Sequence, residues 1–191
     1  MNRTQRRPPG GLAAAAIRPV RPADLPALSD FFAGLSVQTR YLRFFSPVTP
    51  GPALLRLLAG GDGTTHAEVA TRGHVIIGHA MATDRTGPGG IRMTDIGLVV
   101  ADAWQGRGVG SALLRTLLTG AQARGVTSVV MDFLPGNRRV LAMIKRYWPA
   151  APAGHSPDYD TICVPATTAS YVSAGLDPPN GGCFADARFL G

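Results

Sequence analysis

The apolar residues in the first third of the chain recur every three or four positions, which is the period of an amphipathic helix. This pattern runs through 22–35 and 37–46, and through a shorter stretch within 49–63 that ends at its glycines. A short strand is expected before them, over 17–20. The folded part should therefore begin with one strand and three helices.

The pattern then changes to the alternation of apolar and polar residues that is typical of half-buried strands. Residues 66–71 and 74–82 alternate and are joined by an Arg-Gly pair, which predicts a hairpin. After a loop over 84–90, a third strand is expected over 91–102. Its side chains should form two rows, with Asp95, Gly97 and Val99 on one face and Ile96, Leu98 and Val100 on the other.

Strands and helices alternate in the second half. The apolar residues of 110–124 form one helical stripe that Gly125 ends, and a further helix follows Asn137, a residue suited to capping it. Strands are expected at 126–133 and 158–165. A strand, helix and strand in succession favour a parallel pair, whereas the hairpin is antiparallel. The expected fold class is α+β (mixed α/β), with helices packed on a mixed sheet.

The folded part is expected to be one domain over 17–165, an ordinary domain size. Residues 1–16 are interpreted as a disordered leader, and 166–191, with weak periodicity and many turn residues, as a C-terminal tail or arm. The alanine-rich part of the leader has no clear cleavage site, so no signal peptide is expected and a cytoplasmic location is predicted.

The chain carries 19 basic and 12 acidic side chains, a net charge of +7, and Lys145 is its only lysine. A basic surface attracts nucleic acid, membrane or a small polyanion. The arginines are scattered and not interleaved with aromatic residues, which disfavours a nucleic-acid partner. No run of about 18 apolar residues is present, so no membrane partner is expected. An anionic small molecule accounts for the charge.

The cysteines and histidines do not indicate a metal site. Cys163 and Cys183 form no CxxC pair, and the four histidines lack zinc-site spacing. The two cysteines are expected to be free thiols in a reducing compartment, with a disulfide as the alternative in a secreted protein.

One loop carries the clearest chemical signal. The segment 95–118, DIGLVVADAWQGRGVGSALLRTLL, passes from a strand through Gly106, Gly108 and Gly110 directly into a strong helix. Glycine lets a ligand approach the main chain closely, and the first N–H groups of a helix are unpaired and lie at the positive end of its dipole. With the charge of Arg107, they predict an anion site suited to phosphate.

Two common phosphate loops do not fit. A Walker A loop ends in Gly-Lys-Ser/Thr, whereas Gly110 is followed by Ser111 and Ala112. A dinucleotide fingerprint has GxGxxG spacing after the first strand of its domain, with an acidic residue roughly 20 positions on. Here the glycines alternate, several elements precede them, and Asp132 comes a little late.

The segment VVADAWQGRGVGSALL resembles the acetyl-CoA loop of the GNAT acetyltransferase superfamily, whose core is Gln/Arg-x-x-Gly-x-Gly/Ala; Gln105, Gly108 and Gly110 match it. SVQTRYLRFFSP and DIGLVVADAWQGRGVG are further similar to segments of bacterial protein-lysine acetyltransferase domains. The resemblance covers roughly 17–164. It implies a GNAT-like, largely antiparallel sheet of about six to seven strands flanked by helices.

The resemblance also implies acetyl-CoA as cosubstrate, with no metal. The loop would hold its pyrophosphate, the strand before the loop would pair with the pantetheine arm, and an asparagine after the next strand would lie beside it. The implied cofactor-binding residues are Leu98, Val99, Val100, Gln105, Gly106, Arg107, Gly108, Val109, Gly110, Ser111 and Asn137.

The implied reaction is direct attack of an amine on the thioester, with a general base because an amine of pKa about 10.4 is protonated near neutral pH. Asp95 stands where lysine acetyltransferase domains usually carry Glu and is the catalytic candidate; the alternative is a structural ion pair with an arginine. Glu68 is the second candidate for the general base. A main-chain N–H near Val99 is expected to stabilise the oxyanion. Ile144 replaces a tyrosine that donates a proton in many members, with Tyr147 nearby.

The acceptor is expected to be a protein lysine or a small amine, and a homodimer is compatible with the sequence. The shorter acid and the absent tyrosine leave a second interpretation open. In that interpretation the chain is a non-catalytic acyl-CoA-binding module that senses the cofactor or regulates a partner.

Overall fold

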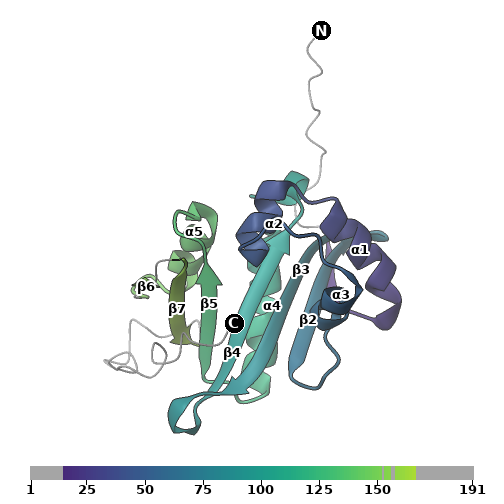
Figure 1. Cartoon of the computed structure of the whole chain (residues 1–191). Helices are drawn as coiled ribbons and strands as arrows, with labels where there is room; N and C mark the ends of the chain where they lie inside the picture. Colours follow the sequence, from purple (N-terminus) through teal and green to yellow (C-terminus); the bar gives the residue numbers. More distant parts are fainter. Residues whose placement is uncertain (1–14, 152, 156–157, 167–191) are drawn as a thin grey trace.

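The computed structural model describes residues 15–151, 153–155 and 158–166. One seven-stranded sheet runs through it in the order β1-β2-β3-β4-β5-β7-β6 (Figure 1). The strands are β1 (Ala16–Pro19), β2 (Thr65–Arg72), β3 (Val75–Thr86), β4 (Arg92–Val100), β5 (Ser128–Phe133), β6 (Ala153–His155) and β7 (Asp160–Pro165). The helices are α1 (Leu25–Ala33), α2 (Val37–Phe44), α3 (Pro52–Ala59), α4 (Val109–Ala123) and α5 (Arg138–Tyr147). Among the described strands, only β4 and β5 pair in parallel, so the expected mixed, largely antiparallel sheet is confirmed.

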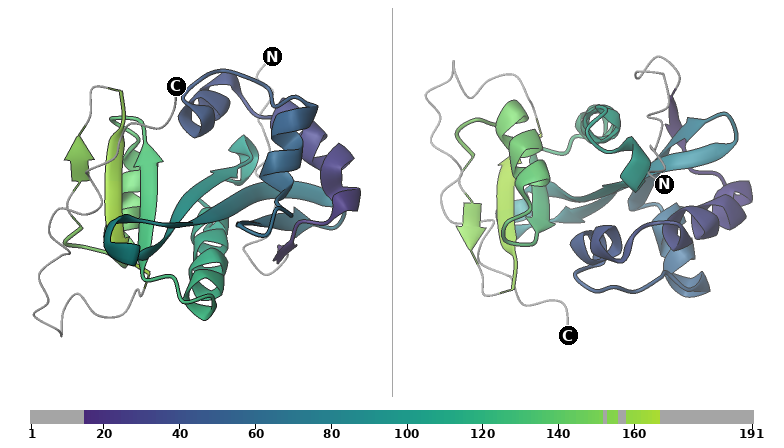
Figure 2. Two further views of the ribbon diagram at one scale, coloured as in Figure 1. Left: turned by 60° about the horizontal axis from the view of Figure 1, so that its bottom comes forward. Right: turned by 90° about the horizontal axis from the view of Figure 1, so that it is seen from above.

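The helices cover the two faces of the sheet separately, with α1, α2 and α3 on one face and α4 and α5 on the other (Figure 2). Each face has its own apolar core. Leu28, Phe32 and Leu58 belong to the first, and Leu113, Leu114 and Ile144 to the second. The two predicted rows of β4 are confirmed, because Val99 packs in the first core and Ile96 and Val100 pack in the second. We call these the α2 face and the α4 face.

The parallel pair of β4 and β5 is short. Its register runs only from Met93 opposite Ser128 to Asp95 opposite Val130. Beyond that point the strands diverge toward the top of Figure 1, while β3 stays paired with β4 as far as Val100. Within the part of the chain that the structure describes, one edge of β4 is therefore left without a strand partner over its last five residues, 96–100.

The structure departs from the predicted elements at a few points. β3 continues to Thr86, through residues predicted as loop, because Asp84 to Thr86 pair with Thr94 to Arg92 of β4. The short β6 has no counterpart in the prediction. At the ends, β1 begins at Ala16, within the predicted leader, and Ala166 is buried in the core; residues 1–14 of the leader and 167–191 of the tail lie outside the described residues.

The thiol of Cys163 is not free. It is disulfide-bonded, so the expectation of a free thiol at this residue was wrong. Cys183, the other cysteine of the chain, lies outside the described residues. No helix in the part of the chain that the structure describes is long and apolar enough to cross a membrane.

The ion pair that follows β1 makes the stability of the fold sensitive to acid. Arg18 donates hydrogen bonds of 2.6 and 2.7 Å to Asp24 and lowers the pKa of that carboxyl to about 2. A carboxyl whose folded pKa is depressed stabilises the fold above its unfolded pKa and loses this effect as the pH falls from about 4 to about 2. We expect Asp24→Asn to lower the free energy of unfolding at pH 7 by about 1–2 kcal/mol.

Urea unfolding at several pH values measures this effect. Asp24→Asn should lose less stability than the wild type between pH 4 and 2. Asp30→Asn, at an exposed position of α1, is the matched control and should follow the wild type. If Asp24→Asn and wild type lose stability in parallel, the ion pair does not have this role.

Candidate active site

The glycine loop ends in an uncapped helix N-terminus. Gly106 and Gly108 have positive φ, 72° and 83°, which only glycine adopts without strain. The N–H of Ala112 makes the first bond of α4, 3.0 Å to the Gly108 carbonyl. The preceding helical N–H groups have no intrahelical acceptor, and no side chain caps them. They are donors available to an anion, as the sequence predicted.

Asp102 anchors the chain segment that leads into this loop. It lies in the 3-10 turn η4 (Asp102–Trp104), and its carboxylate accepts hydrogen bonds from the N–H and Oγ of Ser36, at 2.9 and 2.8 Å, and from Thr39 Oγ1 at 2.7 Å. Ser36 also caps α2 through the N–H of Thr39. The start of α2 and the start of the loop are therefore tied together.

Gln105, the first residue of the motif, holds the loop to three neighbouring elements through its side chain. Its Nε2 donates to the Val100 carbonyl at 3.0 Å and to Thr39 Oγ1 at 3.2 Å, and its Oε1 accepts from Arg139 of α5. Its amide group thus joins the end of β4, α2 and α5. The sequence identified Gln105 as a cofactor-binding residue, but its side chain is engaged by the protein, so any contact with a cofactor would come from its main chain.

Substitution of Gln105 should weaken both the fold and the loop. Gln105→Ala removes three hydrogen bonds and leaves the Val100 carbonyl without this donor, so we expect the free energy of unfolding to fall by about 1–3 kcal/mol. Affinity for CoA should weaken about tenfold because the loop is less preorganised. Gln122→Ala on α4, which removes a hydrogen bond to the Ala166 carbonyl, is the control. Calorimetry should show lower stability in both variants and weaker CoA binding only in Gln105→Ala; equal CoA affinities would contradict the bracing role.

Basic side chains surround the loop. The guanidinium groups of Arg72 and Arg107 both lie 5.1 Å from the ring centroid of Trp104. Trp104, which stands just before Gln105, therefore holds two cations near the start of α4 by cation–π contact. Arg139 adds a third at the Gln105 side chain. A polyanion would find positive charge on several sides of the free N–H groups.

The open edge of β4 presents main-chain groups of alternate residues. The N–H of Ala101 donates to the Ile77 carbonyl of β3, and the carbonyl of Arg92 accepts from Thr127 before β5. The main-chain N–H and C=O groups of successive residues point to opposite edges of a strand. In β4 those of the even-numbered residues therefore point toward β5, and those of the odd-numbered residues point toward β3. Leu98 and Val100 therefore face the open edge, whereas the main chain of Val99 is paired with His79. The roles predicted for the segment Leu98 to Val100, pairing with a cofactor arm and supplying an oxyanion donor near Val99, remain predictions; within this segment Leu98 and Val100 are the residues whose main chain faces the open edge.

Two carboxylates lie on the α2 face where β4 and β5 begin to diverge. Asp95 is 44% exposed and accepts hydrogen bonds from Arg85, 2.7 Å from Nε and 3.4 Å from Nη2. Asp132 of β5 accepts from Thr161 Oγ1 at 2.6 Å. Although Asp132 keeps solvent contact, partial desolvation, aided by the charge of Asp95, raises its pKa above the ordinary value. Sequence reasoning considered Asp132 only as a dinucleotide ligand and missed its position beside Asp95.

The remaining predicted residues fall in different places. Asn137 caps α5, with Oδ1 accepting from the N–H of Val140 at 3.3 Å, close to the Arg139 that reaches the loop. Ile144 is buried in the α4-face core, and Tyr147 donates to the Ser111 carbonyl at 3.1 Å. Glu68 lies on the α4 face, since its register partner Ala80 belongs to that core, and burial raises its pKa. It is separated by the sheet from Asp95.

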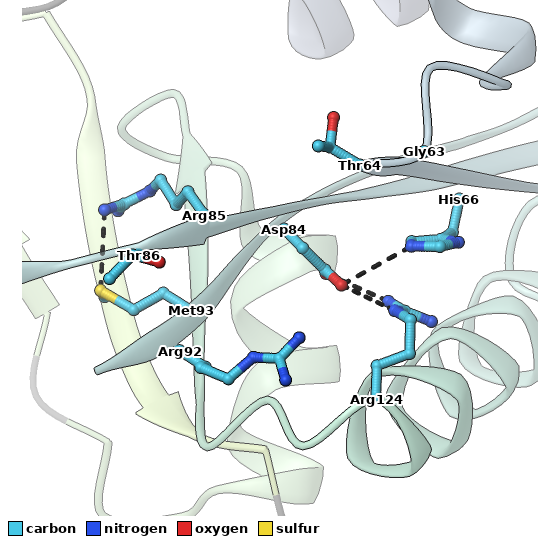
Figure 3. A pocket seen from close by; sticks show the side chains of 9 residues that line it. All are labelled: Gly63, Thr64, His66, Asp84, Arg85, Thr86, Arg92, Met93 and Arg124. Atoms are coloured by element: carbon cyan, nitrogen blue, oxygen red, sulfur yellow. Dashed lines mark hydrogen bonds and ion pairs between the residues drawn. The ribbon is translucent and has the colours of Figure 1, made fainter. Parts of the chain in front are cut away.

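Two cavities lie away from the loop. One, of about 470 Å³, is lined among others by His66, Asp84, Arg92 and Arg124. Within it Asp84 contacts both His66 and Arg124 (Figure 3). The second, of about 510 Å³, shares His66 and Arg124. Neither cavity is lined by a residue of the glycine loop, 105–110. Among the described residues, no three His, Cys, Asp or Glu side chains are grouped so as to hold a metal ion.

The sequence is similar to those of known proteins. Residues 35–147 match the model of the acetyltransferase (GNAT) family. The chain is 31% identical over 138 residues to Acetyltransferase Pat of Mycolicibacterium smegmatis, covering 69% of this chain and 41% of that protein. It thus spans about two fifths of the length of this relative.

Solved structures have the same fold. The GNAT domain of S. lividans PAT superposes with a TM-score of 0.71 at 24% identity, over 79% of this chain and 90% of that one. The yncA protein of Salmonella typhimurium, solved with its cofactor acetyl-CoA, gives 0.63 at 16% identity, over 85% and 99%.

Proposed function

The chain belongs to the GNAT acetyltransferase family, and on this premise we propose that it transfers the acetyl group of acetyl-CoA to an amine. The observation that carries the proposal is the uncapped start of α4 beside the open edge of β4. The first suits the pyrophosphate of CoA and the second suits its amide-containing arm. The family uses acetyl-CoA, and the yncA relative is solved with it.

Different parts of the protein would bind the pyrophosphate and the pantetheine arm of the cofactor. The N–H groups of Gly106 to Ser111 would hold the pyrophosphate, with Arg107 and Arg72 adding charge. The main chain of Leu98 and the N–H of Val100 would pair with the pantetheine arm along the open edge of β4, since Gln105 already holds the Val100 carbonyl. Asn137, at the start of α5, would lie beside that arm. The thioester would then reach the point where β4 and β5 diverge.

We assign the proton transfer to the two carboxylates at this point. Asp95 already accepts two hydrogen bonds from Arg85, one on each carboxylate oxygen, and this pairing disfavours its protonation, so its proposed role is to attract and orient the amine. Asp132, whose pKa is raised, is better suited to accept the proton, and Thr161 orients it. Asp95 as the base remains the role that the family resemblance implies.

Two negative charges also develop during the reaction, one on the carbonyl oxygen and one on the departing sulfur, and each needs a partner. The N–H of Leu98 or Val100 would donate to the oxyanion, since both face the open edge. A CoA thiol has a pKa of about 8.5, so the thiolate can leave and take its proton from water. Ile144 cannot supply one, and the hydroxyl of Tyr147 is engaged with Ser111.

The acceptor can be a protein lysine, as in the lysine acetyltransferase domains that the chain resembles, or a small amine. A non-catalytic acyl-CoA sensor is the rival function, favoured by the apolar Ile144. Release of free CoA thiol from acetyl-CoA, measured with a panel of amines and with amine omitted, separates the two. Amine-dependent thiol release with formation of the acetylated amine supports the enzyme, whereas CoA binding without turnover on any amine favours the sensor.

A further inference from the structure

Glu68 of β2 has a carboxyl group without a partner. Its Oε2 is buried and accepts no hydrogen bond, and none of the ion pairs among the described residues includes this side chain. Burial raises the pKa of the carboxyl group, because its surroundings do not stabilise the charge. Buried polar groups are normally satisfied, so a missing partner needs an explanation. A cationic donor would satisfy this carboxyl group.

The side chain of Glu68 lines the larger of the two cavities described above, of about 510 Å³. This cavity lies at the end of the sheet where β1 stops and β2 begins, between the end of α3 and the residue that follows α4. Val20, Leu25 and Ala59 give it an apolar wall that continues into the α2-face core. Sites for small molecules have this size and combine apolar surface with a few polar groups. The cavity is therefore suited to a small organic ligand.

Two arginines bring positive charge to the same cavity. Arg21 and Arg56 both line it, and neither belongs to an ion pair among the described residues. The charge of Arg21 lowers the pKa of Asp24, but that carboxylate is already paired with another arginine. Arg124 lines the cavity as well, although its guanidinium is paired with Asp84 (Figure 3). Arg21 and Arg56 are therefore the cations available to an anion.

Arg21 and Glu68 lie on the same face of the sheet. Pro19 is opposite Glu68, and the pairing of β1 with β2 continues through the hydrogen bond from the Val20 N–H to the Ala67 carbonyl. The backbone of Arg21 is extended, with φ −117° and ψ 153°, so its side chain starts on the α4 face, diagonally across from Glu68. Such diagonal neighbours are about 7–8 Å apart. Burial is the one cause of the pKa shift of Glu68, so Arg21 is not paired with it directly.

From this arrangement we infer that the cavity is a second ligand site, and that its ligand is a small zwitterion with an apolar side chain, such as leucine. The ammonium of the ligand binds Glu68, and its carboxylate binds Arg21, with further positive charge from Arg56. Its side chain contacts Val20 and Leu25. A simple amine would be repelled by the arginines, and a simple anion would leave the carboxyl group of Glu68 without a partner. The site is separate from the glycine loop, so the inference does not depend on the proposed function.

Isothermal titration calorimetry without acetyl-CoA tests the chemistry of the ligand. Leucine carries both charges, whereas N-acetyl-leucine lacks the cation and leucinamide lacks the anion. Each of these two analogues should bind at least tenfold more weakly than leucine, because a charge-assisted hydrogen bond is lost. Glycine should also bind more weakly, because it has no apolar side chain. An analogue that binds as tightly as leucine, or leucine that does not bind at all, would overturn the inference.

Two variants test the residues. Glu68→Gln and Arg21→Gln should each weaken leucine binding at least tenfold, with circular dichroism used to confirm that both are folded. Asp30→Asn and Arg115→Gln, at exposed positions that do not line the cavity, are the matched controls and should bind leucine like the wild type. Wild-type affinity in both Glu68→Gln and Arg21→Gln would show that leucine binds elsewhere.

The position of bound leucine needs its own measurement, because an amine can also bind at the proposed acetyl-transfer site. In an NMR titration of ¹⁵N-labelled protein with leucine, the N–H signals of Arg21, His66 and Glu68 should shift, with little change at Asp95 and Asp132. Shifts at Asp95 and Asp132, with the cavity unchanged, would place leucine at the acceptor site. That result would overturn the second site and leave the proposed function intact.

Discussion

Gly108→Glu is expected to weaken CoA binding at least 100-fold, or about 3 kcal/mol. Gly108 has φ 83° immediately before α4, so a side chain there is strained and would place a carboxylate among the free N–H groups of the first turn. That carboxylate would occupy the donors and repel a pyrophosphate. Isothermal titration calorimetry with CoA measures the effect, and circular dichroism confirms that the variant is folded.

Gly89→Glu is the matched control. Gly89 also has positive φ, 70°, with open space around it, but it lies in the β3–β4 turn at the opposite end of β4 from the loop. The two variants share the backbone strain and the change in net charge. CoA affinity should be kept in Gly89→Glu; equal losses in both variants, or none in either, would contradict the assignment of the anion site to the glycine loop.

Asp132→Asn is expected to lower kcat about 100-fold without changing CoA affinity, the size of effect typical for loss of a general base. The raised pKa of Asp132 sets the pH dependence. A base acts only when it is deprotonated, so kcat/KM of the wild type should fall as the pH drops through the pKa of this carboxyl, and the variant should lack that limb of the profile.

Asp95→Asn distinguishes the two carboxylates. Loss of the Asp95 charge frees Arg85 and removes the attraction for the amine. KM for the acceptor should therefore rise more than kcat falls. The reverse result, with kcat lost in Asp95→Asn and little changed in Asp132→Asn, would make Asp95 the base, as the family resemblance implies.

The elements that follow from local sequence patterns were predicted well. The two rows of β4 follow from alternation within one strand, and α4 follows from one apolar stripe after a glycine. The point where β4 and β5 diverge could not be predicted, because it depends on how α4, α5 and β7 pack around β5. For the same reason β3 was predicted too short, since only pairing with β4 extends it to Thr86.

In the site, too, the features set by neighbouring residues in the sequence were predicted, and those set by contacts between distant segments were not. The loop was predictable because its glycines and the helix that follows are adjacent in sequence. The role of Gln105 was not, because its partners Thr39 and Arg139 come from distant helices. Arg43 lies in a segment that the sequence already singled out, yet only the structure shows that it rests on Gly97.

The central claim is that CoA lies along the glycine loop and the open edge of β4. An NMR titration of ¹⁵N-labelled protein with CoA tests this most directly, because each backbone N–H reports separately. The N–H signals of Gly106 to Ser111, and of Leu98 and Val100, should shift most, with little change at Arg92 and Arg124. Shifts confined to the cavity beside Arg92 and Arg124, with the loop unchanged, would contradict the account.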